Sequence, residues 1–269
     1  MKQLFFSLLV LLFALKSSAA NVDTVKTYSP SMKKEIKAVV ITPANYNEKD
    51  KFPVVYLLHG YSGNYANWVN SVPAVKTLAD QHQLVIVCPD GNYNSWYLDS
   101  PEQPNSKYET YVSNELVKWI DGNYKTIADK KGRAITGLSM GGHGALYLAF
   151  RHQDVFSVAG SMSGGVDIRP FPNNWDMAKL LGTYAAKPVQ WDNASVINQT
   201  NLLTPNSLAL IIQCGTEDFF YKVNVALHEK LTYQNIPHTF IANPGAHNWK
   251  YWADAIHYQL VFIKTNLKE

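Results

Sequence analysis

Cysteine is scarce in this chain of 269 residues, which contains only Cys88 and Cys214. Two cysteines can form one disulfide at most, and this excludes the small scaffolds that disulfides hold together. Charged side chains are also few, at 17% of residues, and the formal net charge is only +3. A nucleic-acid surface would need clustered lysine and arginine. We therefore expect no nucleic-acid partner.

The chain also lacks an apolar run long enough to cross a membrane, which takes about 20 residues. Its N-terminus has a short basic start, an apolar run from Leu4 to Leu15 and then small residues. This layout predicts a signal peptide over residues 1–20, cleaved after Ala19 or Ala20. An uncleaved anchor is the alternative. We expect an exported, periplasmic or secreted protein without stable membrane insertion, with 22 basic and 21 acidic residues after cleavage.

Residues 21–269 have the pattern of a single α/β domain. Residues 22–46 alternate like an antiparallel strand pair, and six apolar runs then resemble parallel strands buried on both faces. These runs cover residues 53–60, 84–91, 133–142, 157–165, 208–218 and 238–247. Helical segments are expected at 108–121, 141–151, 222–235 and 249–266. The alternation predicts a mostly parallel sheet with helices on both faces.

Residues 166–206 interrupt this alternation. They contain Pro170, Pro172, Pro188 and Pro205 and only short helical pieces. A connection of about forty residues is too long for an ordinary loop, and such segments are usually functional or disordered. Trp175 and Trp191 argue against disorder. We therefore expect a long excursion over the active-site edge of the sheet.

The sequence Gly137-Leu138-Ser139-Met140-Gly141 lies between a predicted strand and a predicted helix. In this context G-x-S-x-G is typical of a nucleophile elbow, where small residues permit a strained turn. A serine nucleophile needs a base, a group that orients the base, and donors for the oxyanion. Ser139 is therefore the candidate nucleophile, against the alternative of a serine in a glycine-rich loop.

The partners of Ser139 should follow predicted strands, because ligands bind at the carboxyl edge of such sheets. His247, just after the last strand, is the candidate base. Asp218 follows the preceding strand and is the candidate acid, although Asp167 is a rival for that role. The backbone N–H groups of Tyr61, in the glycine-containing loop after the first buried run, and Met140 are the candidate oxyanion donors.

Several motifs occur in an order that resembles one enzyme family. They are LLHGYSGNYANW, PDGNYNSWYLDS, YETYVSNELVKWID, GLSMGGHGALYLAFRHQDVFSVAGSMSG, CGTEDFFY and GAHNWKYW. Together they resemble the esterase D-like family of α/β-hydrolases, over roughly residues 30–265. That family includes feruloyl and acetylxylan esterases, tributyrin-type esterases, S-formylglutathione hydrolases and mycolyltransferases.

The resemblance implies an α/β-hydrolase fold and a carboxylic ester hydrolase without metal or cofactor. It places Ser139, Asp218 and His247 at catalytic positions and Tyr61 and Met140 at oxyanion positions. Substrate contacts are expected from four aromatic side chains: Trp96, Tyr97, Trp175 and Trp249. The strand order usual for the family also separates Cys88 from Cys214, so we expect two free thiols.

The substrate is expected to be a small-molecule or oligosaccharide acyl ester, with feruloyl or acetyl esters of plant polysaccharides favoured for an exported member. A general short-chain esterase or an S-formylglutathione hydrolase-like thioesterase is an alternative, as is an acyltransferase that uses the same acyl-serine. An inactive carbohydrate-binding module on the same fold is the alternative from another class. The sequence does not indicate the oligomeric state.

Overall fold

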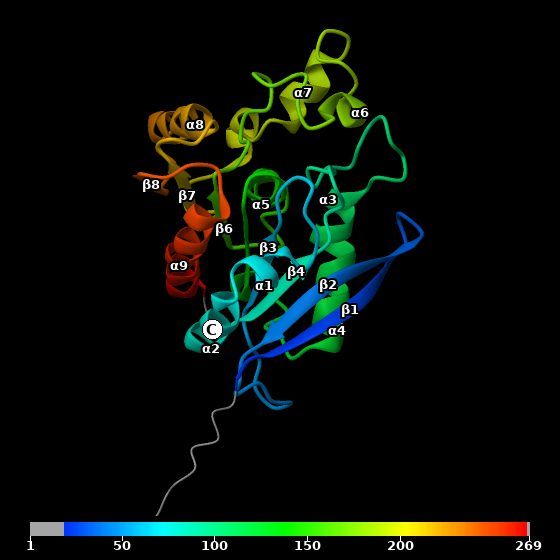
Figure 1. Ribbon diagram of the computed structural model, residues 1–269, viewed down its shortest axis with the longest axis vertical. Helices are drawn as coiled ribbons and strands as arrows, with labels where there is room; N and C mark the ends of the chain where they lie inside the picture. The colour runs from blue at the N-terminus through cyan, green and yellow to red at the C-terminus, as the bar shows by residue number, and fades with distance from the viewer. Residues whose placement is uncertain (1–18, 268–269) are drawn as a thin grey trace, which may run out of the picture.

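The computed structural model describes residues 19–267, which form one sheet of eight strands enclosed by helices (Figure 1). All but the last two residues of the expected signal peptide lie outside the described residues. The strand order is β1-β2-β4-β3-β5-β6-β7-β8. The strands are β1 (Asn21–Ser29), β2 (Lys34–Thr42), β3 (Val54–Leu58), β4 (Val85–Pro89), β5 (Arg133–Gly137), β6 (Val158–Met162), β7 (Ala209–Gly215) and β8 (Thr239–Asn243).

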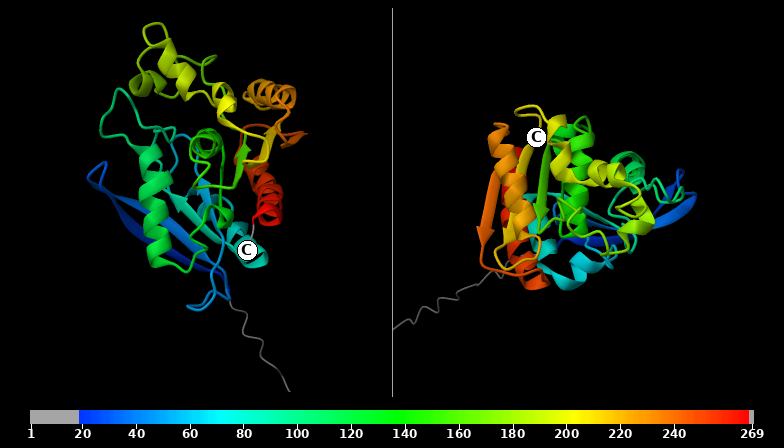
Figure 2. Two further views of the ribbon diagram at one scale, coloured as in Figure 1. Left: turned by 180° about the vertical axis from the view of Figure 1, so that it is seen from behind. Right: turned by 90° about the horizontal axis from the view of Figure 1, so that it is seen from above.

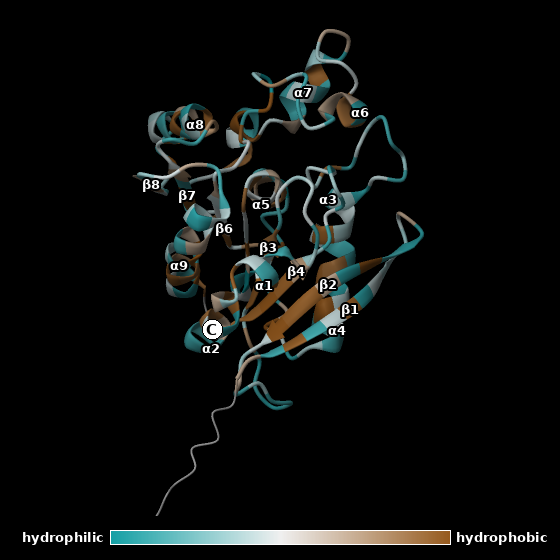
Figure 3. Ribbon diagram, in the orientation of Figure 1, coloured by the Kyte–Doolittle hydropathy of each residue, from teal (hydrophilic) through white to brown (hydrophobic). Residues whose placement is uncertain are grey.

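Strands β3 to β8 run parallel to one another, and the hairpin of β1 and β2 joins the sheet with β2 antiparallel to β4. Every residue of β3, β4, β5 and β6 is buried. These strands therefore have continuous apolar runs rather than alternation, and much of the sheet is brown in Figure 3. The predicted α/β-hydrolase fold, mostly parallel with an antiparallel N-terminal pair, is confirmed.

Two layers of helices cover the sheet (Figure 2). The apolar cluster on one face includes residues of α4, α5 and α8, and the cluster on the other face includes residues of α1, α2 and α9. The helices are α1 (Asn67–Ser71), α2 (Ala74–His82), α3 (Tyr108–Thr110), α4 (Val117–Asn123), α5 (Met140–Arg151), α6 (Met177–Leu181), α7 (Pro188–Ala194), α8 (Tyr221–Tyr233) and α9 (Trp249–Asn266). A π-helical turn, Tyr111–Leu116, joins α3 to α4.

The excursion 166–206 contains α6, α7 and a 3₁₀ segment, Val196–Leu202, and rises beyond the end of the sheet where α5 begins (Figure 1). Buried side chains such as Trp191 and Leu180 join it to the main apolar cluster. The excursion is therefore packed against the domain and contributes to the surface above the carboxyl edge of the sheet.

The two cysteines are buried and free, as predicted. Cys88 lies in β4 and Cys214 in β7, four positions apart in the strand order. At about 4.8 Å per strand the separation is roughly 19 Å, whereas a disulfide needs Cα atoms within about 7 Å. Burial raises the pKa of the Cys88 thiol to about 12, so this thiol stays protonated at neutral pH.

Candidate active site

Ser139 occupies a sharp turn between β5 and α5. The strand ends at Gly137 and the helix begins at Met140, so two residues connect them. Ser139 has a φ of 54° and a ψ of −117°, a conformation that costs a non-glycine residue about 1–3 kcal/mol. Its amide N–H donates to the carbonyl oxygen of Met162 at 2.9 Å. The turn is thus strained, anchored to β6 and placed at the carboxyl edge of the sheet.

Gly141 allows the elbow to lie against the end of β3, and this leads to a prediction about stability. A Cβ atom at position 141 would lie 2.6 Å from the carbonyl oxygens of both Leu58 and His59. We expect Gly141→Ala to lower the free energy of unfolding by about 1–3 kcal/mol, because backbone atoms must move. Gly122→Ala in α4 is the control, since an added Cβ there meets no atom within 4 Å. Denaturant unfolding of the two variants checks this, and equal stabilities would contradict it.

His247 connects Ser139 to Asp218. Its Nε2 lies 2.9 Å from Ser139 Oγ, and its Nδ1 lies 2.8 Å from Asp218 Oδ2. With the proton on Nδ1, His247 donates to the carboxylate while Nε2 can accept the serine proton. This is the geometry that nucleophilic serine chemistry requires. The three residues come from loops after β5, β7 and β8, as the strand pattern predicts.

Two hydrogen bonds hold Asp218 in place. Its Oδ1 accepts from the backbone N–H of Phe220 at 2.8 Å, and its own N–H donates to the carbonyl oxygen of Gly215 at 3.1 Å. The side chain of Asp218 is fully buried. One carboxylate oxygen is thus occupied by the backbone, and the other is directed at His247.

Aromatic rings enclose His247, and these contacts were not predicted from the sequence. Phe219 lies 4.2 Å from the imidazole by ring centroids, and Trp252 meets it edge-on at 4.9 Å. The indole N–H of Trp252 donates to Ser163 Oγ at 3.1 Å, which fixes the tryptophan. The rings limit how far the imidazole can turn. In the sequence, the pair of phenylalanines directly after CGTED could have indicated this packing.

The loop after β3 carries Tyr61, one of the two expected oxyanion donors, and the other, Met140, is the first residue of α5. An added Cβ on Gly60 would lie 3.4 Å from Ser139 Cβ, so this loop passes beside the nucleophile. Among residues 19–267 no acceptor lies within hydrogen-bond distance of the backbone N–H of Tyr61 or Met140. His59, one residue before Gly60, accepts from the N–H of Gly91 at 2.7 Å and stabilises the loop. Both amides are thus available to a developing negative charge.

A cavity of about 310 Å³ contains Ser139 and His247 in its wall. Trp175 and Trp249 also line it, as do Tyr61 and Phe219. Two of the four aromatic residues expected to contact substrate are therefore at the cavity. The exposed fraction of Phe219 is 51%, so an aromatic surface is open to solvent at this site.

Trp96 and Tyr97, the other two expected substrate contacts, do not line this cavity and are 1% and 0% exposed. Consecutive left-handed φ angles of 52° and 59° turn the chain at this point. Trp96 packs on Trp175 at 5.6 Å, and the Tyr97 hydroxyl donates to the His59 carbonyl oxygen at 3.2 Å. The structure thus places them behind the site, where they support Trp175 and the oxyanion loop.

Asp167, the rival acid, is directed elsewhere. Its carboxylate accepts two hydrogen bonds from the Arg169 guanidinium, both at 2.8 Å. His143 is buried between the carbonyl oxygens of Trp96 and Ala194, and burial lowers its pKa to about 4. The structure therefore brings Asp218, and not Asp167, to the histidine that contacts Ser139.

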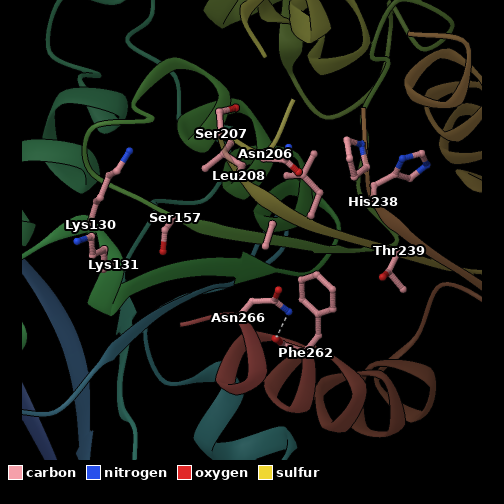
Figure 4. Close-up of a pocket in the computed structure, with 13 residues that line it drawn as sticks. Lys130, Lys131, Ser157, Asn206, Ser207, Leu208, His238, Thr239, Phe262 and Asn266 are labelled. Carbon is pink, nitrogen blue, oxygen red and sulfur yellow. Dashed lines mark hydrogen bonds between the residues drawn. The ribbon is translucent and has the colours of Figure 1, made fainter. Parts of the chain in front are cut away.

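A second cavity, of about 570 Å³, lies at the opposite edge of the sheet, at the start of β6, β7 and β8 (Figure 4). It contains Ser157 and Ser207, but the Nε2 atom of His238, the histidine in its wall, forms a hydrogen bond with His228 Nδ1 at 2.7 Å. No serine–histidine hydrogen bond is found there in the described part of the chain. Among the cavities formed by residues 19–267, only the one at Ser139 has the geometry for nucleophilic catalysis.

Comparison with known proteins agrees with this geometry. Residues 29–263 match the Esterase family model. The chain belongs to this family. It is a carboxylic ester hydrolase with the α/β-hydrolase fold of the esterase D-like enzymes, as the motif resemblance implies.

Individual relatives show how far the similarity extends. An acetyl esterase from Caldicellulosiruptor saccharolyticus is 26% identical, across 85% of this chain and 92% of its own length. The mycolyltransferase Ag85B from Mycobacterium leprae is 29% identical, across 74% and 72%. A solved ferulic acid esterase superposes with a TM-score of 0.80 at 28% identity, across 93% and 99%.

Residues 19–267 lack two features that would bear on the site. No group of three or more His, Cys, Asp or Glu side chains there could hold a metal ion. Among the same residues no helix is both long and apolar enough to cross a membrane.

Proposed function

We propose that this protein is an exported serine esterase that removes acetyl or feruloyl groups from plant polysaccharides or their oligosaccharides. The observation that carries the chemistry is the position of His247 between Ser139 and Asp218, at 2.9 and 2.8 Å. Export is supported by the pattern of residues 1–20. The acetyl esterase and the ferulic acid esterase among its relatives support the substrate class.

The reaction begins when Ser139 Oγ attacks the ester carbonyl carbon and His247 Nε2 takes the serine proton. Asp218 holds the imidazole in the required tautomer and stabilises the imidazolium. The N–H groups of Tyr61 and Met140 stabilise the oxyanion, and each such donor contributes about 10²–10³ in rate. The imidazolium then protonates the leaving alcohol. Water attacks the acyl-serine with His247 again as base, which releases the acid and restores Ser139.

The surroundings of Ser139 suit an acyl group with an aromatic or short aliphatic body. Trp175 stacks on Phe219 with ring centroids 6.0 Å apart, and Trp249 lines the same cavity. Tyr61 meets the exposed Tyr93 edge-on at 4.9 Å. Aromatic faces at a cavity mouth bind sugar rings and phenolic rings through apolar contact, while the catalytic groups stay at its base.

A hydrolysis panel tests the substrate class. We expect kcat/KM for acetylated xylan or methyl ferulate to exceed that for tributyrin, because the cavity of about 310 Å³ is small and lined with aromatic rings. The panel also includes p-nitrophenyl esters of rising chain length, for which kcat/KM should fall beyond the short chains. Highest activity on tributyrin and long-chain esters would contradict the proposal and favour a general lipolytic esterase.

Acyl transfer is the second candidate because Ag85B, a mycolyltransferase, is a relative across most of both chains. Transfer differs from hydrolysis only in the group that attacks the acyl-serine. Adding a sugar acceptor to the esterase reaction and analysing the products by mass spectrometry separates the two. Acylated sugar in excess of free acid would identify a transferase.

A further inference from the structure

A large polar hollow lies beneath the excursion and outside the active site. Its volume is about 860 Å³, and it is bounded by the excursion on one side and by α5 and the loop at Leu98–Pro101 on the other. None of the residues that line the catalytic cavity also lines this hollow. The mechanism above uses no part of it.

A second hollow of about 590 Å³ lies beside this one, since Asp99, Tyr147 and Arg151 line both. The π-helical turn contributes Ser113 and Asn114 to the second hollow. Such turns are rare and often occur at functional sites. We call the two hollows together the α5 groove. A groove formed by two adjacent hollows suits an extended ligand better than a compact one.

The α5 groove lies well away from the nucleophile. Helix α5 starts at Met140, beside Ser139, and the groove meets it at Tyr147 and Arg151. At 1.5 Å per residue these positions are about 12 Å and 18 Å along the helix from Ser139. The excursion supplies Trp175 to the catalytic cavity and residues 181–202 to the groove, so one segment lines both sites.

The charges in the groove largely compensate one another and leave an excess of negative charge. The guanidinium of Arg169 pairs with Asp167 and Asp192, and that of Arg151 pairs with Glu109. The lining holds two guanidinium groups, Arg151 and Arg169, and four carboxylates, Asp99, Glu109, Asp154 and Asp192. A polyanion would be repelled, and no lysine is present to attract one. The groove therefore favours an uncharged ligand.

The groove wall also contains amide oxygens that lack a donor. Gln199 is 5% exposed, and its Nε2 donates to the carbonyl oxygen of Asn193, which identifies the other amide atom as oxygen. That Oε1 has no hydrogen-bond donor among the described residues, and the same holds for Gln190 Oε1. A buried acceptor without a donor is costly. Both oxygens are closed to solvent, so a ligand O–H group reaches them only when the two side chains turn toward the groove, a change that gives each oxygen a donor.

Donors are present beside these acceptors. Asn193 and Asn201 are exposed at the groove, and their carboxamides can both donate and accept. The lining thus contains amide oxygens that lack a donor, carboxamide groups that can donate, and no net positive charge. The hydroxyl groups of a neutral sugar both donate and accept, so they match this lining. A peptide would need exposed apolar anchors, and Leu202 alone among the lining residues is a large exposed hydrophobic residue.

We propose that the α5 groove binds an uncharged oligosaccharide segment, separately from the ester at Ser139. The choice of a plant polysaccharide as its source rests on the proposed function, whereas the binding itself does not. The groove would hold the polymer on the enzyme, which raises the local concentration of its acyl groups at the catalytic cavity.

Calorimetric titration of the intact protein with unesterified xylohexaose tests the groove, because this probe has no ester to hydrolyse. Binding should persist after a fluorophosphonate has blocked Ser139. Gln199→Met and Gln190→Ala should each raise Kd about two- to tenfold, the effect of one neutral hydrogen bond. Gln81→Ala, at an exposed position in α2, is the matched control and should leave Kd unchanged. Thermal unfolding confirms that each variant is folded.

Three results would overturn the groove assignment: no binding of xylohexaose, binding abolished by the fluorophosphonate, or Kd values equal in all variants. Tighter binding of an oligogalacturonate than of xylohexaose would also overturn it, since that anion should be repelled. Hydrolysis of p-nitrophenyl acetate is measured on the same sample. Active protein that does not bind the sugar refutes the groove alone, and sugar binding without hydrolysis refutes the esterase proposal alone.

Discussion

Replacing Ser139 by alanine should lower kcat for p-nitrophenyl acetate by roughly 10⁶-fold, the loss that removal of a triad nucleophile produces. The residual rate should still exceed the uncatalysed rate by about 10³–10⁴, because the oxyanion donors and substrate binding remain. The measurement is initial velocity at saturating ester, with wild-type contamination excluded by mass spectrometry.

The fold should survive this change. Alanine at position 139 has the same backbone restrictions as serine, and the substitution removes one side-chain hydrogen bond, to His247. The unfolding midpoint should therefore stay close to that of the wild type. Ser157→Ala is the control, since the Ser157 hydroxyl has no hydrogen-bond partner, histidine included, in the part of the chain that the structure describes. That variant should keep wild-type activity, and Ser139→Ala with a tenth of wild-type activity would exclude the serine mechanism.

The order of the elements and the candidate triad could be read from the sequence because each depends on local patterns. Strands buried on both faces are continuous apolar runs, and β3 to β6 are of this kind. The residues that follow parallel strands meet at one edge of the sheet. The G-x-S-x-G pattern selected Ser139, and the strand-edge rule indicated His247 among eight histidines. The rule favoured Asp218 but left Asp167, which also follows a strand, as a rival.

The pocket could not be predicted in the same way. Trp96 and Tyr97 lie in a loop next to the site, but successive left-handed backbone angles turn their side chains into the core. Phe219 comes to His247 from the loop after β7, which is distant in sequence, and Trp252 comes from the first turn of α9. Such placements depend on tertiary packing. The short helices α1 and α2 were also not predicted from the sequence.

The π-helical turn is another feature that could not be predicted from the sequence. The segment 108–121 was predicted as one regular helix from its apolar spacing. The structure has π-helical hydrogen bonding over Tyr111–Leu116, where an extra residue per turn shifts the spacing. Glu109, just before this turn, is buried and pairs with Arg151 and His152. Burial alone would raise the pKa of Glu109, but hydrogen bonds from these partners lower it.

Asp218→Asn should reduce kcat by about 10⁴-fold while the fold is retained. An amide can still accept the bond from the Phe220 N–H, but if its NH₂ faces His247 Nδ1, the imidazole must carry its proton on Nε2 and cannot accept one from Ser139. Asp167→Asn is the matched comparison. Asp167 contacts Arg169 and lies outside the Ser139–His247–Asp218 chain of hydrogen bonds, so its kcat should stay near the wild-type value. A larger loss of kcat in Asp167→Asn than in Asp218→Asn would identify Asp167 as the acid. It would also require a different conformation of the loop after β6.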